Sequence, residues 1–190
     1  NIMGKAMSRV DIPAKVDGSA FYGLDYNTDD MLFAAIRLAP VFGTKLVSVD
    51  ATEALKRRGV KKVIELKDSV AVVADNYWRA KEALKVVAAQ FERSDNDSVS
   101  SADIAARFDA ELARSEGSED FEAGDAETNL NQAGEIVEAS YRVPYLAHAP
   151  MEPMNCTVHI QNGRADVWTS TQDPLAVRGR VASVAGLNER

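Results

Sequence analysis

The residues best suited to chemistry lie between Pro144 and Gln172, a stretch that holds both histidines and the single cysteine. A metal site built from His148, Cys156 and His159 would need the three side chains to converge. Cys156 and His159 lie an odd number of residues apart on one predicted strand, so they point to opposite faces. We therefore predict no metal ligand here. His148 and Cys156 also lack any spacing typical of a hydrolytic nucleophile and its base.

Glu152 is the acidic residue of this stretch and has Met151, Pro153 and Met154 as neighbours. In apolar surroundings the pKa of a carboxyl group rises, and such a group can act as a base. The alternative, which we favour, is a carboxylate hydrogen-bonded to the backbone of a tight turn.

A hairpin followed by a helix is predicted to position these side chains. Residues 156–160 form a β-branched, alternating run, residues 161–163 (Gln-Asn-Gly) signal a tight turn, and residues 165–169 return as the second strand. Asp173 is a suitable N-cap and Pro174 a suitable first residue for a helix over 173–187. Gln172 thus lies between a strand end and a helix start, a position from which it can meet a ligand.

The stretches AHAPMEPMNCTV (147–158) and VWTSTQDP (167–174) resemble the large, molybdenum-cofactor-binding subunit of the xanthine oxidase and aldehyde oxidase family. The likeness is greatest to the isoquinoline 1-oxidoreductase β-subunit type. Residues 4–26, 31–66 and 70–84 resemble that family's α/β hammerhead domain. The resemblance covers about the whole chain except an acidic stretch near 93–133.

The resemblance assigns Gln172 as a cofactor-binding residue. In the family, the glutamine of the S-T-Q motif reaches the molybdenum centre and hydrogen-bonds an oxygen ligand of the metal. A neutral amide can donate there without adding charge beside the metal. The alternative is a strand-end amide that bonds the following turn.

The rest of that active site is expected beyond Arg190. The family's glycine-rich segment and its catalytic glutamate base would both follow this helix, so we predict no catalytic residue within the chain. We expect the natural chain to continue. We also expect this stretch alone to bind no molybdopterin and to be inactive.

The activity implied by the resemblance is that of a bacterial molybdopterin-dependent oxidoreductase, a hydroxylase or dehydrogenase. It would oxidise aldehydes or N-heteroaromatic compounds with water as the oxygen source. Electrons would pass to iron–sulfur clusters of a small partner subunit. The main alternative is a non-catalytic α/β hammerhead interaction module; a hydrolase using Glu152 and His148 is a more distant one.

The predicted fold class is α+β, an α/β hammerhead domain followed by the first β-hairpin and helix of a molybdenum-cofactor-binding domain. We expect a lead-in linker at 1–20, the hammerhead domain at 21–133 with an acidic surface insertion near 93–133, and a truncated cofactor domain at 134–190. The predicted strands are 31–39 (buried), 44–49, 60–66, 70–74 (buried) and 134–144; the predicted helices are 51–58, 77–85 and 101–115, with a loop at 117–131. Residues 86–91 could extend the helix at 77–85 or form a strand, and the resemblance favours a strand. Arg37 is expected to be a paired strand residue, with a substrate-facing role as the alternative, and Tyr77-Trp78 to lie in the core.

Charge and composition exclude several classes. Residues 93–138 carry 13 acidic and 3 basic side chains, so this stretch outweighs the chain's net charge of −7 and reads as a solvated surface segment. There is no basic stripe for nucleic acid, and no apolar run approaches the roughly 20 residues that span a bilayer. One cysteine excludes an internal disulfide and a four-cysteine metal or iron–sulfur site. We expect a soluble bacterial protein of the cytoplasm or periplasm.

Overall fold

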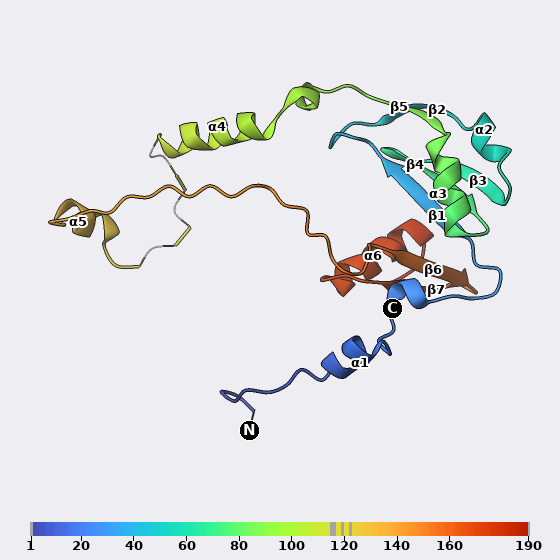
Figure 1. Ribbon diagram of the computed structural model, residues 1–190, viewed down its shortest axis with the longest axis horizontal. Helices are drawn as coiled ribbons and strands as arrows, with labels where there is room; N and C mark the ends of the chain where they lie inside the picture. The colour runs from blue at the N-terminus through green and yellow to red at the C-terminus, as the bar shows by residue number, and fades with distance from the viewer. Residues whose placement is uncertain (1, 115–116, 119, 122, 190) are drawn as a thin grey trace. The chain divides into compact units, whose positions relative to one another are not determined.

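The computed structural model describes residues 2–114, 117–118, 120–121 and 123–189 (Figure 1). The chain forms two compact units. We call Asp30–Val143 the sheet unit, and Asn1–Asp29 together with Pro144–Arg190 the hairpin unit. The fold is α+β, as the sequence predicts.

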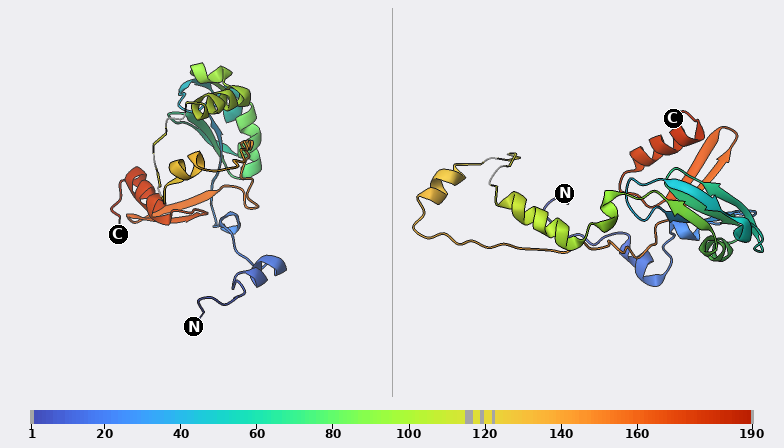
Figure 2. Two further views of the ribbon diagram at one scale, coloured as in Figure 1. Left: turned by 90° about the vertical axis from the view of Figure 1, so that its left-hand side faces the viewer. Right: turned by 90° about the horizontal axis from the view of Figure 1, so that it is seen from above.

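The core of the sheet unit is a three-stranded antiparallel sheet in the order β1-β4-β3. Its strands are β1 (Phe33–Leu38), β3 (Val60–Glu65) and β4 (Ser69–Ala74). The central strand β4 is almost wholly buried because it has a hydrogen-bonded neighbour on each side and helix α3 (Tyr77–Lys85) against one face. The α3 side chains in this core are Ala80, Ala83 and Leu84. Helix α3 lies along the sheet of β1, β4 and β3 (Figures 1 and 2).

A second, two-stranded sheet pairs β2 (Leu46–Asp50) with β5 (Ala88–Phe91), and the short helix α2 (Thr52–Leu55) follows β2. Gly59 then leads into β3 with φ +82°, and a Cβ there would lie 2.4 Å from Oδ1 of Asp75. Glycine is needed at this position for both reasons.

Arg37 is a paired strand residue, which confirms the structural interpretation of this cation. Its Nη1 donates to the Val87 carbonyl at 3.0 Å, and its Nη2 donates to the Leu84 carbonyl. The Leu84 carbonyl also accepts from the Val87 N–H at 3.3 Å, so Arg37 adds a charged donor at the C-terminal end of α3, where a cation complements the helix dipole.

We predict that Arg37→Met lowers the free energy of unfolding of the chain by about 2 kcal/mol, because two hydrogen bonds from a charged donor to the Leu84 and Val87 carbonyls are lost. Chemical denaturation measures this. Arg57→Met, at an exposed arginine, is the matched control and should change stability by less than about 0.5 kcal/mol. Equal effects of the two variants would contradict the capping role.

The acidic segment contains η2 (Asp95–Ser98), α4 (Ser101–Leu112) and α5 (Ala126–Asn131), none of which has a buried residue. Helix α4 begins with a capping box: the Ser100 Oγ accepts from the Asp103 N–H at 3.2 Å, and Asp103 accepts from the Ser100 N–H at 2.8 Å. These solvated helices fit the predicted surface segment.

Acidification should loosen the start of α4. Hydrogen bonds from the Ser100 side chain and backbone hold the pKa of Asp103 below its ordinary value. A depressed pKa stabilises the folded helix above about pH 4, and this stabilisation is lost as the pH falls through the folded-state pKa. Amide exchange of residues 101–104 should therefore accelerate at low pH beyond the intrinsic rate. Asp103→Asn should remove this dependence, and its persistence in that variant would contradict the assignment.

The hairpin unit contains α1 (Ile12–Asp17), η1 (Gly23–Asp25), β6 (Cys156–Gln161), β7 (Arg164–Thr169) and α6 (Pro174–Ala185). Strands β6 and β7 pair antiparallel around Asn162 and Gly163, whose φ angles of 51° and 74° are those of a type I′ turn. Helix α6 runs beside the β6–β7 ribbon (Figure 2). These elements confirm the predicted hairpin and final helix.

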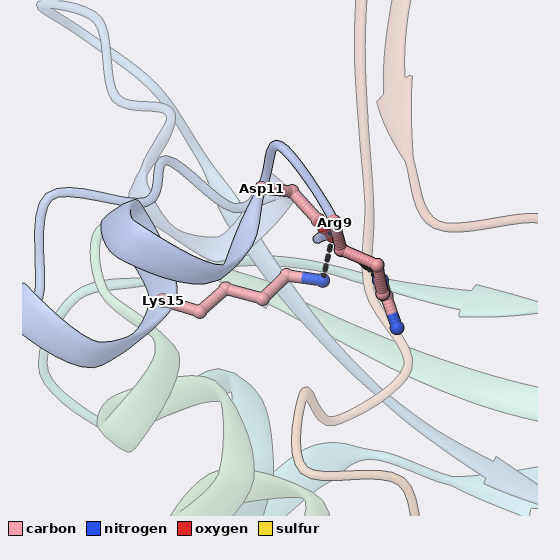
Figure 3. A network of polar contacts seen from close by, with 3 residues as sticks. All are labelled: Arg9, Asp11 and Lys15. Atoms are coloured by element: carbon pink, nitrogen blue, oxygen red, sulfur yellow. Dashed lines mark hydrogen bonds and ion pairs between the residues drawn. The ribbon is translucent and has the colours of Figure 1, made fainter. Parts of the chain in front are cut away.

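Near α1, a local ion-pair network surrounds Asp11 (Figure 3). The Arg9 guanidinium binds both Asp11 oxygens, at 3.0 and 2.6 Å, and the Lys15 Nζ lies 2.7 Å from Oδ2. These hydrogen bonds, first that from Arg9, hold the pKa of Asp11 far below its usual range. All three side chains are exposed to solvent, so these ion pairs contribute little to stability.

Several predicted elements differ in the structure. Residues 134–144 form no strand, and their large side chains are exposed. The predicted helix 51–58 shortens to α2, with Ala51 as its N-cap and Lys56 as its C-cap. The predicted linker 1–20 contains α1 and the predicted loop 117–131 contains α5; Ser115, the expected end of α4, lies outside the described residues.

Two predictions of burial were wrong. In β1 only Ala35 is buried, while Ile36 and Leu38 are 54% and 63% exposed, because one face of the sheet carries α3 and β1 lies at its edge. Tyr77 and Trp78 are 53% and 67% exposed, since the buried face of α3 is formed by its small residues.

The compact units also cross the predicted domain boundaries. Residues 21–29 belong with the hairpin unit, and residues 134–143 belong with the sheet unit. The predicted boundaries at 20 and 133 follow the family resemblance, whereas the compact units follow contacts within the chain. The predicted boundaries therefore stay a prediction. Within the described residues, no helix combines the length and apolar character needed to cross a membrane.

Candidate functional site

Gln172 lies in the short connection between β7 and α6, and it is exposed. Upstream, the Thr169 Oγ1 at the end of β7 donates to the Asn155 carbonyl at 2.8 Å. Downstream, the Asp173 N–H donates to Oγ1 of Thr171 at 3.0 Å, and Asp173 caps α6 by accepting from the Ala176 N–H at 3.0 Å. The connection is therefore anchored on both sides of Gln172.

The Gln172 amide makes no hydrogen bond within the described part of the chain. The turn that it was expected to bond, in the structural alternative, is instead held by Thr171 and Asp173. The amide keeps two donors and one acceptor for a ligand.

Glu152 lies at the centre of a set of contacts among Gly23, Tyr26, Asn155 and Trp168, which we call the junction. Its Oε1 accepts from the Gly23 N–H at 3.1 Å and from Nδ2 of Asn155 at 2.9 Å. The predicted backbone hydrogen bond is present, but its donor is 129 residues away rather than in a local turn. Both N–H donors bind the same carboxylate oxygen, Oε1.

Two further contacts close this junction. The rings of Tyr26 and Trp168 stack with centroids 3.6 Å apart and planes at 18°. A Cβ on Gly23 would lie 2.6 Å from Oδ1 of Asn155, so the backbone of η1 packs directly against that side chain. The same Oδ1 is buried and has no hydrogen-bond partner among the described residues.

Gly23 and Tyr26 were not identified as site residues from the sequence. Their partners lie more than 120 residues away in sequence, and no local periodicity marks such a contact. The clue within the sequence was the Gly-Leu-Asp-Tyr stretch at the end of one of the regions that resemble the family.

The histidines and the cysteine do not converge. His159 faces Asp166 across the β6–β7 ladder, Cys156 faces Thr169, and the alternation of β6 puts Cys156 and His159 on opposite faces. His148 lies in the irregular, exposed segment before β6. Among the described residues, no group of three or more His, Cys, Asp or Glu is placed to hold a metal.

A groove of about 940 Å³ runs between β7 and α6. Its lining combines apolar side chains such as Val167 and Val181 with charged ones such as Arg164 and Arg178. Thr171 lines the groove but Gln172 does not, so the concavity and the predicted cofactor residue are neighbours rather than one site.

The sequence is similar to that of several known proteins. Residues 109–190 match the family model of a molybdopterin cofactor-binding domain. The chain is 29% identical over 217 residues to the nicotinate dehydrogenase large molybdopterin subunit of Eubacterium barkeri, covering 98% of this chain and 51% of that protein. It is 28% identical over 205 residues to isoquinoline 1-oxidoreductase subunit beta of Brevundimonas diminuta, covering 98% and 25%.

The fold matches part of a solved structure of quinoline 2-oxidoreductase from Pseudomonas putida 86, with a TM-score of 0.68 and 18% identity over 100% of this chain and 29% of that one. The chain is thus distantly similar to the large molybdopterin subunit of one dehydrogenase and to subunit beta of one oxidoreductase, and its residues 109–190 are similar to a molybdopterin cofactor-binding domain. It spans about half and a quarter of the two curated relatives.

We predict that Gly23→Ala detaches η1 from the hairpin, because the added methyl overlaps the Asn155 side chain; overpacking of this kind costs roughly 1–3 kcal/mol. In a Trp78→Phe background, Trp168 is the sole tryptophan. Its emission should then shift to longer wavelength as the Tyr26 ring leaves. Gly134→Ala, where a Cβ meets nothing within 4 Å, is the control. An unchanged Trp168 spectrum in Gly23→Ala would contradict the junction.

Proposed function

We propose that this chain is part of the large subunit of a molybdopterin-dependent hydroxylase or dehydrogenase, and that Gln172 contacts the cofactor. The observation that carries the proposal is the exposed amide of Gln172, free of partners in the described structure and anchored on both sides. It lies within the residues that match the molybdopterin cofactor-binding domain.

The residues present fit such a group. Residues 168–172 carry no charged side chain, and the amide offers neutral donors suited to an oxygen atom of the cofactor. When bound, the cofactor supplies two-electron oxidation of substrate with water as the oxygen source. The chain's own contribution is to hold the Gln172 donors in place, with Thr169 and Asp173 fixing the ends of the connection.

The substrate class is proposed from the relatives, whose names specify nicotinate, isoquinoline and quinoline. These compounds are N-heteroaromatic, and we propose that class, with aldehydes second. Electrons would leave to iron–sulfur clusters of a partner subunit. We also propose that the sheet unit is the α/β hammerhead domain.

The hairpin unit is proposed to be completed by further polypeptide of the natural protein. Among residues 2–29 and 144–189, Ala182 alone is buried, so this unit has very little core of its own. A two-stranded ribbon with one helix is marginal in isolation. We therefore propose that residues 1–190 alone hold no cofactor and are inactive.

The test is Gln172→Ala in the full-length protein, matured in a host that loads the molybdenum cofactor. Loss of a group that supports a metal centre typically costs about 10–100-fold, so we expect a fall of that order in kcat/KM with an N-heteroaromatic substrate. Gln161→Ala, at an exposed glutamine ending β6, is the matched control and should match wild type.

Two outcomes would overturn the proposal. Wild-type kinetics in Gln172→Ala would remove the role of this residue. Matured protein without molybdenum would favour the non-catalytic interaction module instead.

A further inference from the structure

We propose that Glu152 is a positioning residue that holds Gln172 in its working orientation through Asn155 and Thr169. This inference rests on the proposed function, since it assigns to Glu152 the task of orienting the amide that meets the cofactor. Glu152 would act as a hydrogen-bond acceptor and not as a base.

The first step is the commitment of the Glu152 carboxylate. Its Oε1 accepts from Gly23 at 3.1 Å and from Asn155 at 2.9 Å, and the side chain is half-buried. Within the described residues no cation forms an ion pair with it. Hydrogen bonds to a charged acceptor are stronger than neutral ones, so the carboxylate is well suited to tie η1 to the segment before β6.

The second step is the orientation of Asn155. Its Nδ2 donates both to Glu152 and to the Pro153 carbonyl, each at 2.9 Å. This leaves the buried Oδ1 without a partner among the described residues, an arrangement that persists only where other contacts fix the side chain. With the side chain fixed, the main-chain carbonyl of Asn155 is held facing the end of β7.

The third step is the transfer to Gln172. The Thr169 hydroxyl donates to the Asn155 carbonyl at 2.8 Å. Thr169 pairs with Cys156 at the end of the β6–β7 ladder, and Asn155 is the residue before Cys156. Only Ser170 and Thr171 separate that anchor from Gln172, and Asp173 follows as the cap of α6. Loss of the Thr169 side-chain bond would leave the ladder pair of Cys156 with Thr169 as the remaining hold on the strand side, next to the cap on the helix side.

Glutamine at position 152 separates this role from general-base catalysis. Its amide oxygen can accept the same two hydrogen bonds, whereas it cannot take up a proton as a base. Glu152→Gln should therefore preserve function if the residue positions, and abolish function if it is the base. Glu152→Ala removes the acceptor in either case.

The experiment uses full-length, cofactor-loaded protein and compares wild type, Gln172→Ala, Glu152→Ala and Glu152→Gln. Readouts are molybdenum content, the EPR spectrum of the Mo(V) state, and kcat and KM. We expect Glu152→Ala to shift the Mo(V) spectrum in the same direction as Gln172→Ala and to lower kcat about 10-fold with KM little changed. Glu152→Gln should stay within about twofold of wild type. Glu138→Ala, at an exposed glutamate outside the junction, is the control.

A second pair of variants guards against simple loss of folding. Thr169→Val is close in shape but lacks the hydroxyl, so it should reproduce the effect of Glu152→Ala, while Thr169→Ser should behave as wild type. Amide exchange of residues 170–172, measured on the same proteins, should be faster in Glu152→Ala and Thr169→Val only.

The two proposals fail in different ways. If Gln172→Ala leaves the Mo(V) spectrum unchanged, the proposed function fails. If Gln172→Ala changes the spectrum and Glu152→Ala does not, the role of Glu152 alone is overturned. Loss of activity in Glu152→Gln equal to that in Glu152→Ala also overturns it, in favour of a base.

Discussion

The hydrogen bond from the Gly23 N–H to the Glu152 carboxylate is the contact on which the hairpin unit depends. It joins two segments separated by 129 positions, and the stacked rings of Tyr26 and Trp168 reinforce it. A ribbon and a helix with so little buried surface need such long-range ties to hold one conformation. The early part of the chain therefore acts as a structural component of the later part, and sequence order is a poor guide to the units.

The connection between β7 and α6 is short and held at both ends. Within the described part of the chain, the Gln172 amide in this connection makes no hydrogen bond. Polar contacts hold Thr169 on one side and Asp173 on the other, so the chain supplies orientation before any ligand arrives. Preorganised donors of this kind are more effective than flexible ones because they need no reordering upon binding.

Local sequence signals predicted many of the helices and strands, whereas contacts between residues far apart in the sequence were not predicted. The Asp173 cap and the Asn162-Gly163 turn act through neighbouring residues, so the elements beside them were predicted correctly. The alternation of residues 134–144 predicted a strand, yet a strand needs a partner, and none pairs with it among the described residues. Gln172 was predicted as a site residue from the family resemblance and not from its chemistry. The proposed link from Glu152 to Gln172 depends on contacts that no local sequence pattern marks.

The most direct measurement is an experimental structure of the full-length, matured protein with its cofactor bound. We expect Nε2 of Gln172 to lie within hydrogen-bond distance, about 2.7–3.2 Å, of an oxygen atom of the molybdenum cofactor. We also expect Glu152 to accept from the Gly23 N–H in that structure. A Gln172 side chain turned into its own polypeptide, away from the metal centre, would contradict the central claim.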